Sequence, residues 1–194
     1  MDTIITAFEP FGSHKVNSSQ LILKKLNVNA RKLVLPVSYA SVKSILENIF
    51  TNPPSTLLML GLAPFSTSLE LEVIALNVAH SRLKDNDGIV KLNSVIYEDG
   101  PLALKTNVDV EEIHNVLYDN KIPSVISYHA GTYLCNYAYY VALYNSYIRN
   151  LKTRILFVHV PNATEAVIDD PKKPSLPLDF LSKSIRIILE NIDE

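Results

Sequence analysis

Thr56-Leu57-Leu58-Met59-Leu60 is a short and almost entirely apolar run in the first third of the chain. A run without polar alternation is typical of a strand that is covered on both faces of its sheet. A second run, Arg154-Ile155-Leu156-Phe157-Val158-His159-Val160, is also mostly apolar. Two such runs, separated by helical patterns, favour a sheet of largely parallel strands between helices.

Shorter patterns around these runs alternate between strand and helix. Further strands are predicted over residues 3–8, 32–37, 69–78 and 124–127. In residues 69–73 apolar residues alternate with two glutamates, which predicts a strand with one polar face. Helices are predicted after the capping residues Asn17, Ser38 and Asp109, and over residues 134–149 and 179–192. This order predicts one α/β domain over residues 1–194, with a mainly parallel twisted sheet and helices on both faces.

Composition excludes several classes of protein. The chain has 194 residues, of which 47% are hydrophobic and 20% charged, and its formal net charge is −2. These values are typical of a soluble globular protein, and no basic cluster indicates a nucleic-acid or anionic-membrane partner. No apolar stretch approaches the roughly 18 residues of a membrane span, and the first residues lack a cationic start. We therefore expect a cytoplasmic protein.

Glycine spacing argues against phosphate-binding loops. The closest two of the five glycines, Gly88 and Gly100, are twelve positions apart, whereas the common nucleotide motifs need glycines at five or fewer positions. Asp85-Asn86-Asp87-Gly88 is similar to part of a calcium loop, but Leu83 and Ser94 stand where the outer ligands belong. We expect no metal and no cofactor.

The single cysteine, Cys135, is the first candidate for chemistry. It cannot form an internal disulfide or a multi-thiolate zinc site. If Thr132 caps the helix over residues 134–149, Cys135 lies in the first turn, where free N–H groups and the helix dipole favour a thiolate. Free cysteines are, however, among the most buried residue types, so a structural role remains open.

A nucleophilic cysteine needs a base and a carboxylate that orients it. His159 lies late in an apolar strand, directly before Pro161, and His129 is its main rival because it is closer to Cys135 in sequence. Glu70 and Glu72 share one face of their predicted strand, so spacing cannot choose between them. The remaining histidines, interpreted as solvated, are His14, His80 and His114.

An aromatic turn follows the first predicted strand. Phe8-Glu9-Pro10-Phe11-Gly12 places two aromatic rings at a carboxyl end of the sheet, where ligands collect in this class of fold. The segment is either the wall of an apolar pocket or a surface turn with one core ring.

At these residues the chain resembles the pyroglutamyl peptidase I family, also called pyrrolidone carboxyl peptidases. Four separated blocks carry the resemblance. They are Thr6-Ala7-Phe8-Glu9-Pro10-Phe11-Gly12 with Asn17, Glu72-Val73-Ile74-Ala75-Leu76-Asn77 followed by Arg82 and Asp85-Asn86-Asp87-Gly88, Ala130-Gly131-Thr132-Tyr133-Leu134-Cys135-Asn136, and Val158-His159-Val160-Pro161. The chain departs from the family's pattern at Ser13, Ser66, Lys84 and His129.

The resemblance implies that Glu72, Cys135 and His159 are catalytic. It implies a pocket for the pyroglutamate ring formed by Phe8, Phe11, Asn17, Leu83, Tyr133 and Leu134, and an anion-stabilising role for Arg82 beside the Cys135 amide. The implied activity is removal of N-terminal pyroglutamate (5-oxoproline) from peptides through an acyl-enzyme. A homo-oligomer, commonly a tetramer, is also implied. The alternatives are a cysteine amidase of other acyl specificity and a non-catalytic homologue that binds pyroglutamyl ends.

Overall fold

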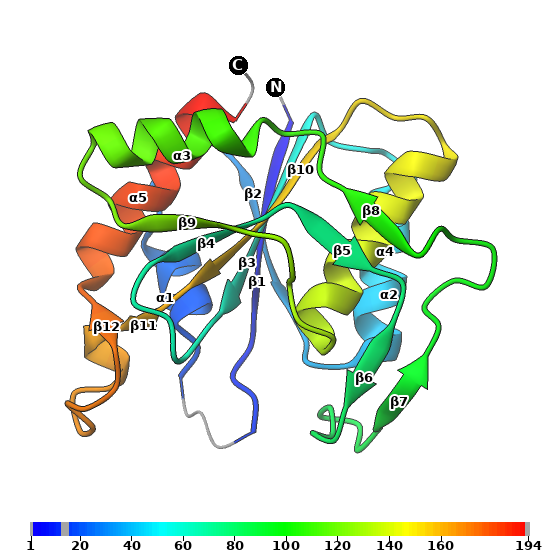
Figure 1. Ribbon diagram of the computed structural model, residues 1–194, viewed down its shortest axis with the longest axis horizontal. Coiled ribbons are helices and arrows are strands. Elements are labelled where there is room, and N and C mark those ends of the chain that lie inside the picture. The colour runs from blue at the N-terminus through cyan, green and yellow to red at the C-terminus, as the bar shows by residue number, and fades with distance from the viewer. Residues whose placement is uncertain (1, 13–15, 193–194) are drawn as a thin grey trace.

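The computed structural model describes residues 2–12 and 16–192 and is organised around one six-stranded sheet (Figure 1). Its strands are β1 (Thr3–Phe8), β2 (Arg31–Leu35), β3 (Thr56–Leu62), β4 (Leu69–Glu72), β9 (Ser124–Ser127) and β10 (Arg154–Val160). Their order is β2-β1-β3-β10-β4-β9. Every neighbouring pair is parallel except β10 with β4, so the predicted single α/β domain with a mainly parallel sheet is confirmed.

Helices cover both faces of this sheet, as predicted. The five α-helices of the described chain are α1 (Ser18–Lys25), α2 (Tyr39–Ile49), α3 (Val110–Asp119), α4 (Leu134–Ile148) and α5 (Leu178–Asn191). In Figure 1, α1, α3 and α5 lie on one side, and α2 and α4 lie on the other. Both faces of the central strands are therefore removed from water.

The central strand β3 is apolar along its length because it contacts both helical layers. All seven of its residues are buried. Leu57 and Met59 belong to the core under α2 and α4, whereas Leu58 and Leu60 belong to the core under α1 and α5. As predicted, residues 56–60 lack polar alternation because both faces of the strand are buried.

Three of the helix starts have the predicted caps. The side chains of Asn17, Ser38 and Asp109 accept backbone N–H groups of the first turns of α1, α2 and α3. The suggested cap of α4 is wrong, because Tyr133 and not Thr132 occupies the N-cap position, without a side-chain bond. The Thr132 hydroxyl instead donates to the His80 carbonyl at 2.7 Å.

The strand predicted over residues 69–78 is divided in two. β4 ends at Glu72, and β5 (Ile74–Leu76) pairs with β8 (Ala103–Lys105) in a separate small sheet. The predicted polar face is also wrong, because Glu72 is completely buried and Glu70 is half-buried. The Tyr139 hydroxyl on α4 donates to the Glu72 carbonyl at 2.9 Å. Helix α4 therefore covers the carboxyl end of β4 on the side of the sheet where Glu72 lies.

The remaining elements are short and were not predicted. β6 (Ala79–Ser81) pairs with β7 (Lys91–Ser94), β11 (Asn162–Ala163) pairs with β12 (Ser175–Leu176), and η1 (Thr164–Ala166) is a single 3₁₀ turn. Strands of two to four residues contain too few positions for a periodic pattern. Among the described residues, none of the helices has the length and hydropathy needed to cross a bilayer.

Candidate active site

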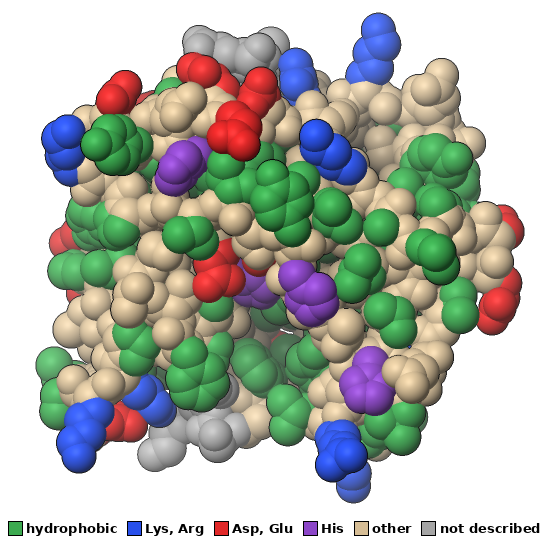
Figure 2. Space-filling view, in the orientation of Figure 1, with side chains coloured by type: hydrophobic (Ala, Val, Ile, Leu, Met, Phe, Trp, Pro, Cys, Tyr) green, Lys and Arg blue, Asp and Glu red, His purple; other side chains and the backbone are tan. Residues whose placement is uncertain are grey.

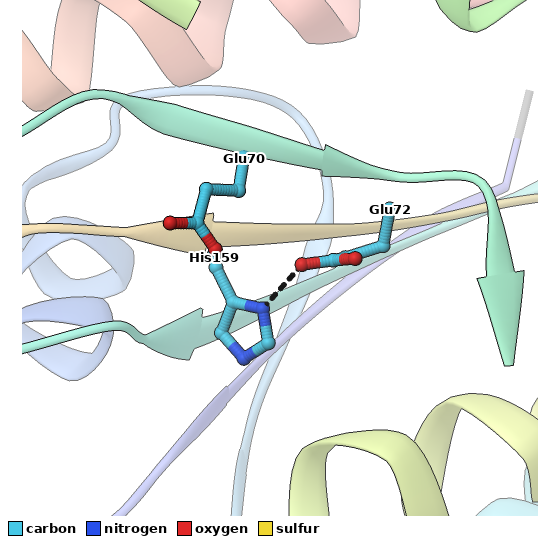
Figure 3. A group of neighbouring side chains, drawn as sticks. All are labelled: Glu70, Glu72 and His159. Carbon is cyan, nitrogen blue, oxygen red and sulfur yellow. Dashed lines mark hydrogen bonds and ion pairs between the residues drawn. The ribbon is translucent and has the colours of Figure 1, made fainter. Parts of the chain in front are cut away.

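His159 and Glu72 form a buried pair at the centre of the sheet (Figure 3). The Nδ1–H of His159 donates to Glu72 Oε1 at 2.7 Å. Glu72 is 0% exposed and His159 is 8% exposed. Glu72 is the register partner of Phe157 in the antiparallel β10–β4 pair, so it lies diagonally across from His159 on the same side of the sheet. The hydrogen bond fixes the ring and leaves its Nε2 free for a second partner.

The charge of His159 is set by competing effects. Burial alone lowers the pKa of the ring, because it disfavours the charged form. The negative charge and hydrogen bonding of the Cys135 thiolate, followed by those of Glu72, outweigh burial and raise the pKa of His159 to about 10. The site therefore favours the charged imidazolium form of His159 at neutral pH.

Cys135 is the second residue of α4 and lies in its first turn. Its Sγ lies against Gly61 on β3, where a Cβ atom would be only 2.9 Å from the sulfur. Gly61 is also the register partner of His159 on β10. The only thiol in the chain thus lies beside the imidazole and near unpaired N–H groups of a helix start.

A turn between β9 and α4 leads the chain to Cys135. β9 runs antiparallel to β10 and ends at Ser127, level with Glu72. Residues 128–133 then lead to α4, and Gly131 within them has a φ of 77°, which favours glycine. The exposed rival base His129 accepts the Gly131 N–H through Nδ1 at 3.1 Å. It therefore participates in this turn, whereas His159 interacts with Cys135.

Two other histidines are less solvated than predicted. His80 Nδ1 accepts the Asn93 N–H at 3.2 Å, and His114 Nδ1 is 2.9 Å from the Ser124 hydroxyl. Both are half-buried, because their rings bridge neighbouring segments. His14 and the departure at Ser13 lie outside the described residues.

A small apolar cavity adjoins Cys135. Its lining residues come from strand ends, loops and the start of α4 and are Phe8, Phe11, Asn17, Val37, Leu62, Tyr133, Leu134 and Cys135. The ring centroids of Phe11 and Tyr133 are 6.3 Å apart. The free volume is only about 20 Å³, so a ring-sized ligand would have to separate these walls.

A larger groove of about 370 Å³ lies beside β9 and the start of α3 and contains none of the predicted site residues.

Asn17 is fully engaged in shaping this cavity. Its Oδ1 accepts the Ser19 N–H at 3.0 Å and the Ser19 hydroxyl at 2.8 Å, and its amide donates to the Glu9 carbonyl at 3.1 Å. Its side chain thus connects α1 to the aromatic turn. Arg82 and Leu83 are both exposed in the segment after β6, and neither is among the residues that line this cavity.

Sequence reasoning missed three residues of the site. Val37 and Leu62 line the cavity, and both lie at the carboxyl ends of predicted strands, which is the signal that was available. Glu9 joins the surrounding loops, because its Oε1 accepts the Val37 N–H at 3.0 Å and the Asn86 amide at 2.6 Å. Residue type and spacing do not predict such a cross-loop contact.

Glu70, Glu72 and His159 also form the one cluster of possible metal ligands found among residues 2–12 and 16–192. One potential ligand atom from each lies within 4.8 Å of the others. The Nδ1 of His159 is already hydrogen-bonded to Glu72. The arrangement is therefore best described as an oriented imidazole flanked by a second carboxylate.

Comparisons with known proteins agree with the resemblance. A profile described as pyroglutamyl peptidase matches residues 1–194. The pyrrolidone-carboxylate peptidase of Thermococcus litoralis is 36% identical, over 96% of this chain and 90% of that protein. The crystal structure of pyrrolidone carboxyl peptidase from Fervidobacterium islandicum AW-1 has a TM-score of 0.93 and 38% identity, and the match covers 100% and 98% of the two chains. The chain belongs to the pyroglutamyl peptidase family.

Proposed function

We propose that this protein is a cysteine peptidase that removes N-terminal pyroglutamate from peptides. The observation that carries the proposal is the arrangement of Cys135, His159 and Glu72, in which a thiol at a helix start adjoins an imidazole held by a buried carboxylate. The family membership and the apolar cavity beside the thiol support the same activity.

The proposed reaction proceeds through a thioester. The Cys135 thiolate attacks the carbonyl carbon of the pyroglutamyl residue, and backbone N–H groups at the start of α4 stabilise the oxyanion. His159 donates a proton to the leaving amine as the C–N bond breaks, and then accepts a proton from the water that hydrolyses the thioester. Glu72 orients the ring and stabilises its charged form. Arg82 is exposed and does not line the cavity, and its anion-stabilising role beside the Cys135 amide stays a prediction of the resemblance.

The cavity supports selection of a neutral cyclic end group. Phe8, Phe11, Tyr133 and Leu134 present apolar surface to the space beside Cys135. A flat lactam ring carries no charge and can occupy the space between such walls once they separate, whereas a free α-ammonium group would lose its water without gaining a partner. Prolyl peptides should therefore be poor substrates although their ring has a similar size.

Hydrolysis of fluorogenic amides tests this function. We expect the protein to release the fluorophore from pyroglutamyl amide and to leave prolyl and glutaminyl amides intact. Cys135→Ala and His159→Ala should each lower kcat by at least about 10³-fold. Unchanged circular dichroism would show that both variants fold. Hydrolysis of other amides but not of the pyroglutamyl one would indicate an amidase of other specificity, and binding without turnover would indicate a non-catalytic homologue.

The assembly and location of the protein belong to the same proposal. Residues 83–102 expose a group of apolar side chains, which are Leu83, Ile89, Val90, Leu92, Val95 and Leu102. Clustered exposed apolar surface is typical of a protein interface, so we assign it to a homo-oligomer, with a tetramer as the expected state. A peptidase that depends on one free thiol also fits the reducing cytoplasm.

A further inference from the structure

We propose that Glu70 gives the enzyme a preference for peptides with a cationic residue directly after pyroglutamate, and a disadvantage with Asp or Glu at that position. The inference rests on the proposed function, because it concerns the peptide that leaves when the bond is cut. It assigns a role to a carboxylate that the catalytic steps do not use.

The position of Glu70 follows from the register of β4. Glu70 is the direct partner of His159 across the antiparallel β10–β4 pair, and residues that face one another in such a pair project from the same side of the sheet. The neighbouring Leu69 and Leu71 project to the opposite side and are completely buried. Figure 3 shows the Glu70 side chain extending from β4 toward His159 on β10. One of its oxygens lies within 4.8 Å of a ring nitrogen of His159.

The leaving peptide must pass close to this carboxylate. Its amine receives a proton from Nε2 of His159, the ring nitrogen that Glu72 leaves free, and so lies at about 3 Å from that atom. With Glu70 within 4.8 Å of the ring, the first side chain of the leaving peptide falls within about one Debye length of the carboxylate. Figure 2 shows acidic and histidine side chains next to one another at the edge of a hollow near the middle of this face.

The surrounding charges leave Glu70 uncompensated. Among the described residues, its carboxylate takes part in none of the ion pairs or hydrogen bonds. Glu72, by contrast, is buried and hydrogen-bonded to His159, which compensates its charge. Half-buried Glu70 therefore supplies an open negative charge beside the path of the leaving group.

The test compares peptides that differ only in the residue after pyroglutamate. At low salt we expect the wild-type kcat/KM to be roughly three- to tenfold higher with Lys than with Glu at that position, and a neutral Gln peptide to fall between them. Glu70→Gln should reduce this ratio to nearly one, mainly by improving the Glu peptide. Glu98→Gln removes the same charge from an exposed loop and should leave the ratio unchanged.

Other results would overturn the inference. A wild-type ratio near one, or a ratio that survives Glu70→Gln in a folded variant, would show that Glu70 does not sense the leaving peptide. A uniform change for all three peptides with a shifted pH profile would show that Glu70 acts on His159 instead. Failure of the wild type to cleave even the Gln peptide would contradict the proposed function itself.

Discussion

Gly61 lies where the core residue Phe157 and the candidate nucleophile Cys135 leave no room for another side chain. A Cβ atom there would be 2.7 Å from the ring of Phe157 and 2.9 Å from Cys135 Sγ. The absence of a side chain at this residue therefore allows the helix of the thiol to approach β3.

Gly61→Ala should damage both stability and activity. Overpacking of a dense core typically costs about 1–3 kcal/mol, and displacement of Cys135 should lower kcat more than tenfold. Denaturant unfolding and turnover of a pyroglutamyl amide measure the two effects. Ile185→Val on α5 is the control: it changes a buried residue and should lower the free energy of unfolding by about 1 kcal/mol while leaving kcat unaltered. Full activity in Gly61→Ala would show that the sulfur has space to move.

The raised pKa of His159 predicts an unusual pH dependence. Interactions that favour the imidazolium contribute fully below the ordinary value of 6.5 and are lost as the pH rises through about 10. Because the charged ring supplies the proton to the leaving amine, kcat/KM should fall only near pH 10. Glu72→Gln removes one of the stabilising charges and should move this alkaline limb to lower pH. If the alkaline limb of the pH profile did not move, Glu72 would not stabilise the imidazolium form of His159.

At the level of elements, the cavity is assembled from loops that one carboxylate connects. Glu9 follows β1 and accepts hydrogen bonds from Val37 after β2 and from Asn86 in the loop beyond β6. The backbone of Asn86 also donates to the Val37 carbonyl at 2.8 Å. The Tyr133 hydroxyl joins the same loop through the Lys84 carbonyl at 3.0 Å. The walls of the cavity are thus positioned by contacts between segments that are far apart in sequence.

Glu9→Ala should loosen these walls without touching the reacting groups. We expect KM for a pyroglutamyl amide to rise about tenfold, with a smaller change in kcat, because the walls contact ground state and transition state alike. Glu9→Gln keeps an acceptor oxygen and should recover much of the affinity. Steady-state kinetics of both variants distinguish this from a catalytic role, since a loss confined to kcat would contradict it.

For the whole molecule, the exposed apolar side chains of residues 83–102 predict self-association. Light scattering should give the wild type a mass that is a multiple of 21.7 kDa. A variant with Leu92→Asp and Leu102→Asp should shift toward the monomer, because both side chains are more than half exposed and would carry charge into the contact. Ile168→Asp, at an exposed residue outside this segment, is the matched control. A monomeric wild type would remove the basis of the proposed oligomer.

Much of the fold could be predicted because its determinants are local. Strands over residues 3–8, 124–127 and 154–160 have the predicted bounds, and the caps Asn17, Ser38 and Asp109 begin their helices. Apolar runs and caps act within a few residues, so they can be recognised without knowledge of the pairing. The short strands that pair in twos could not be predicted, because their stability comes from the partner strand.

Local patterns in the chain predicted the α/β order of elements, and the motif resemblance identified Cys135, His159 and Glu72 before any geometry was known. The packing of distant segments, by contrast, buries Glu72 against His159 and leaves Glu70 half-buried beside it. The two glutamates have the same spacing and the same strand face, and their environments differ because α4 covers one end of that face. Only the structure could also place Glu9 between three loops. Such contacts form between segments that are far apart in sequence. No local pattern in the chain encodes how these segments pack.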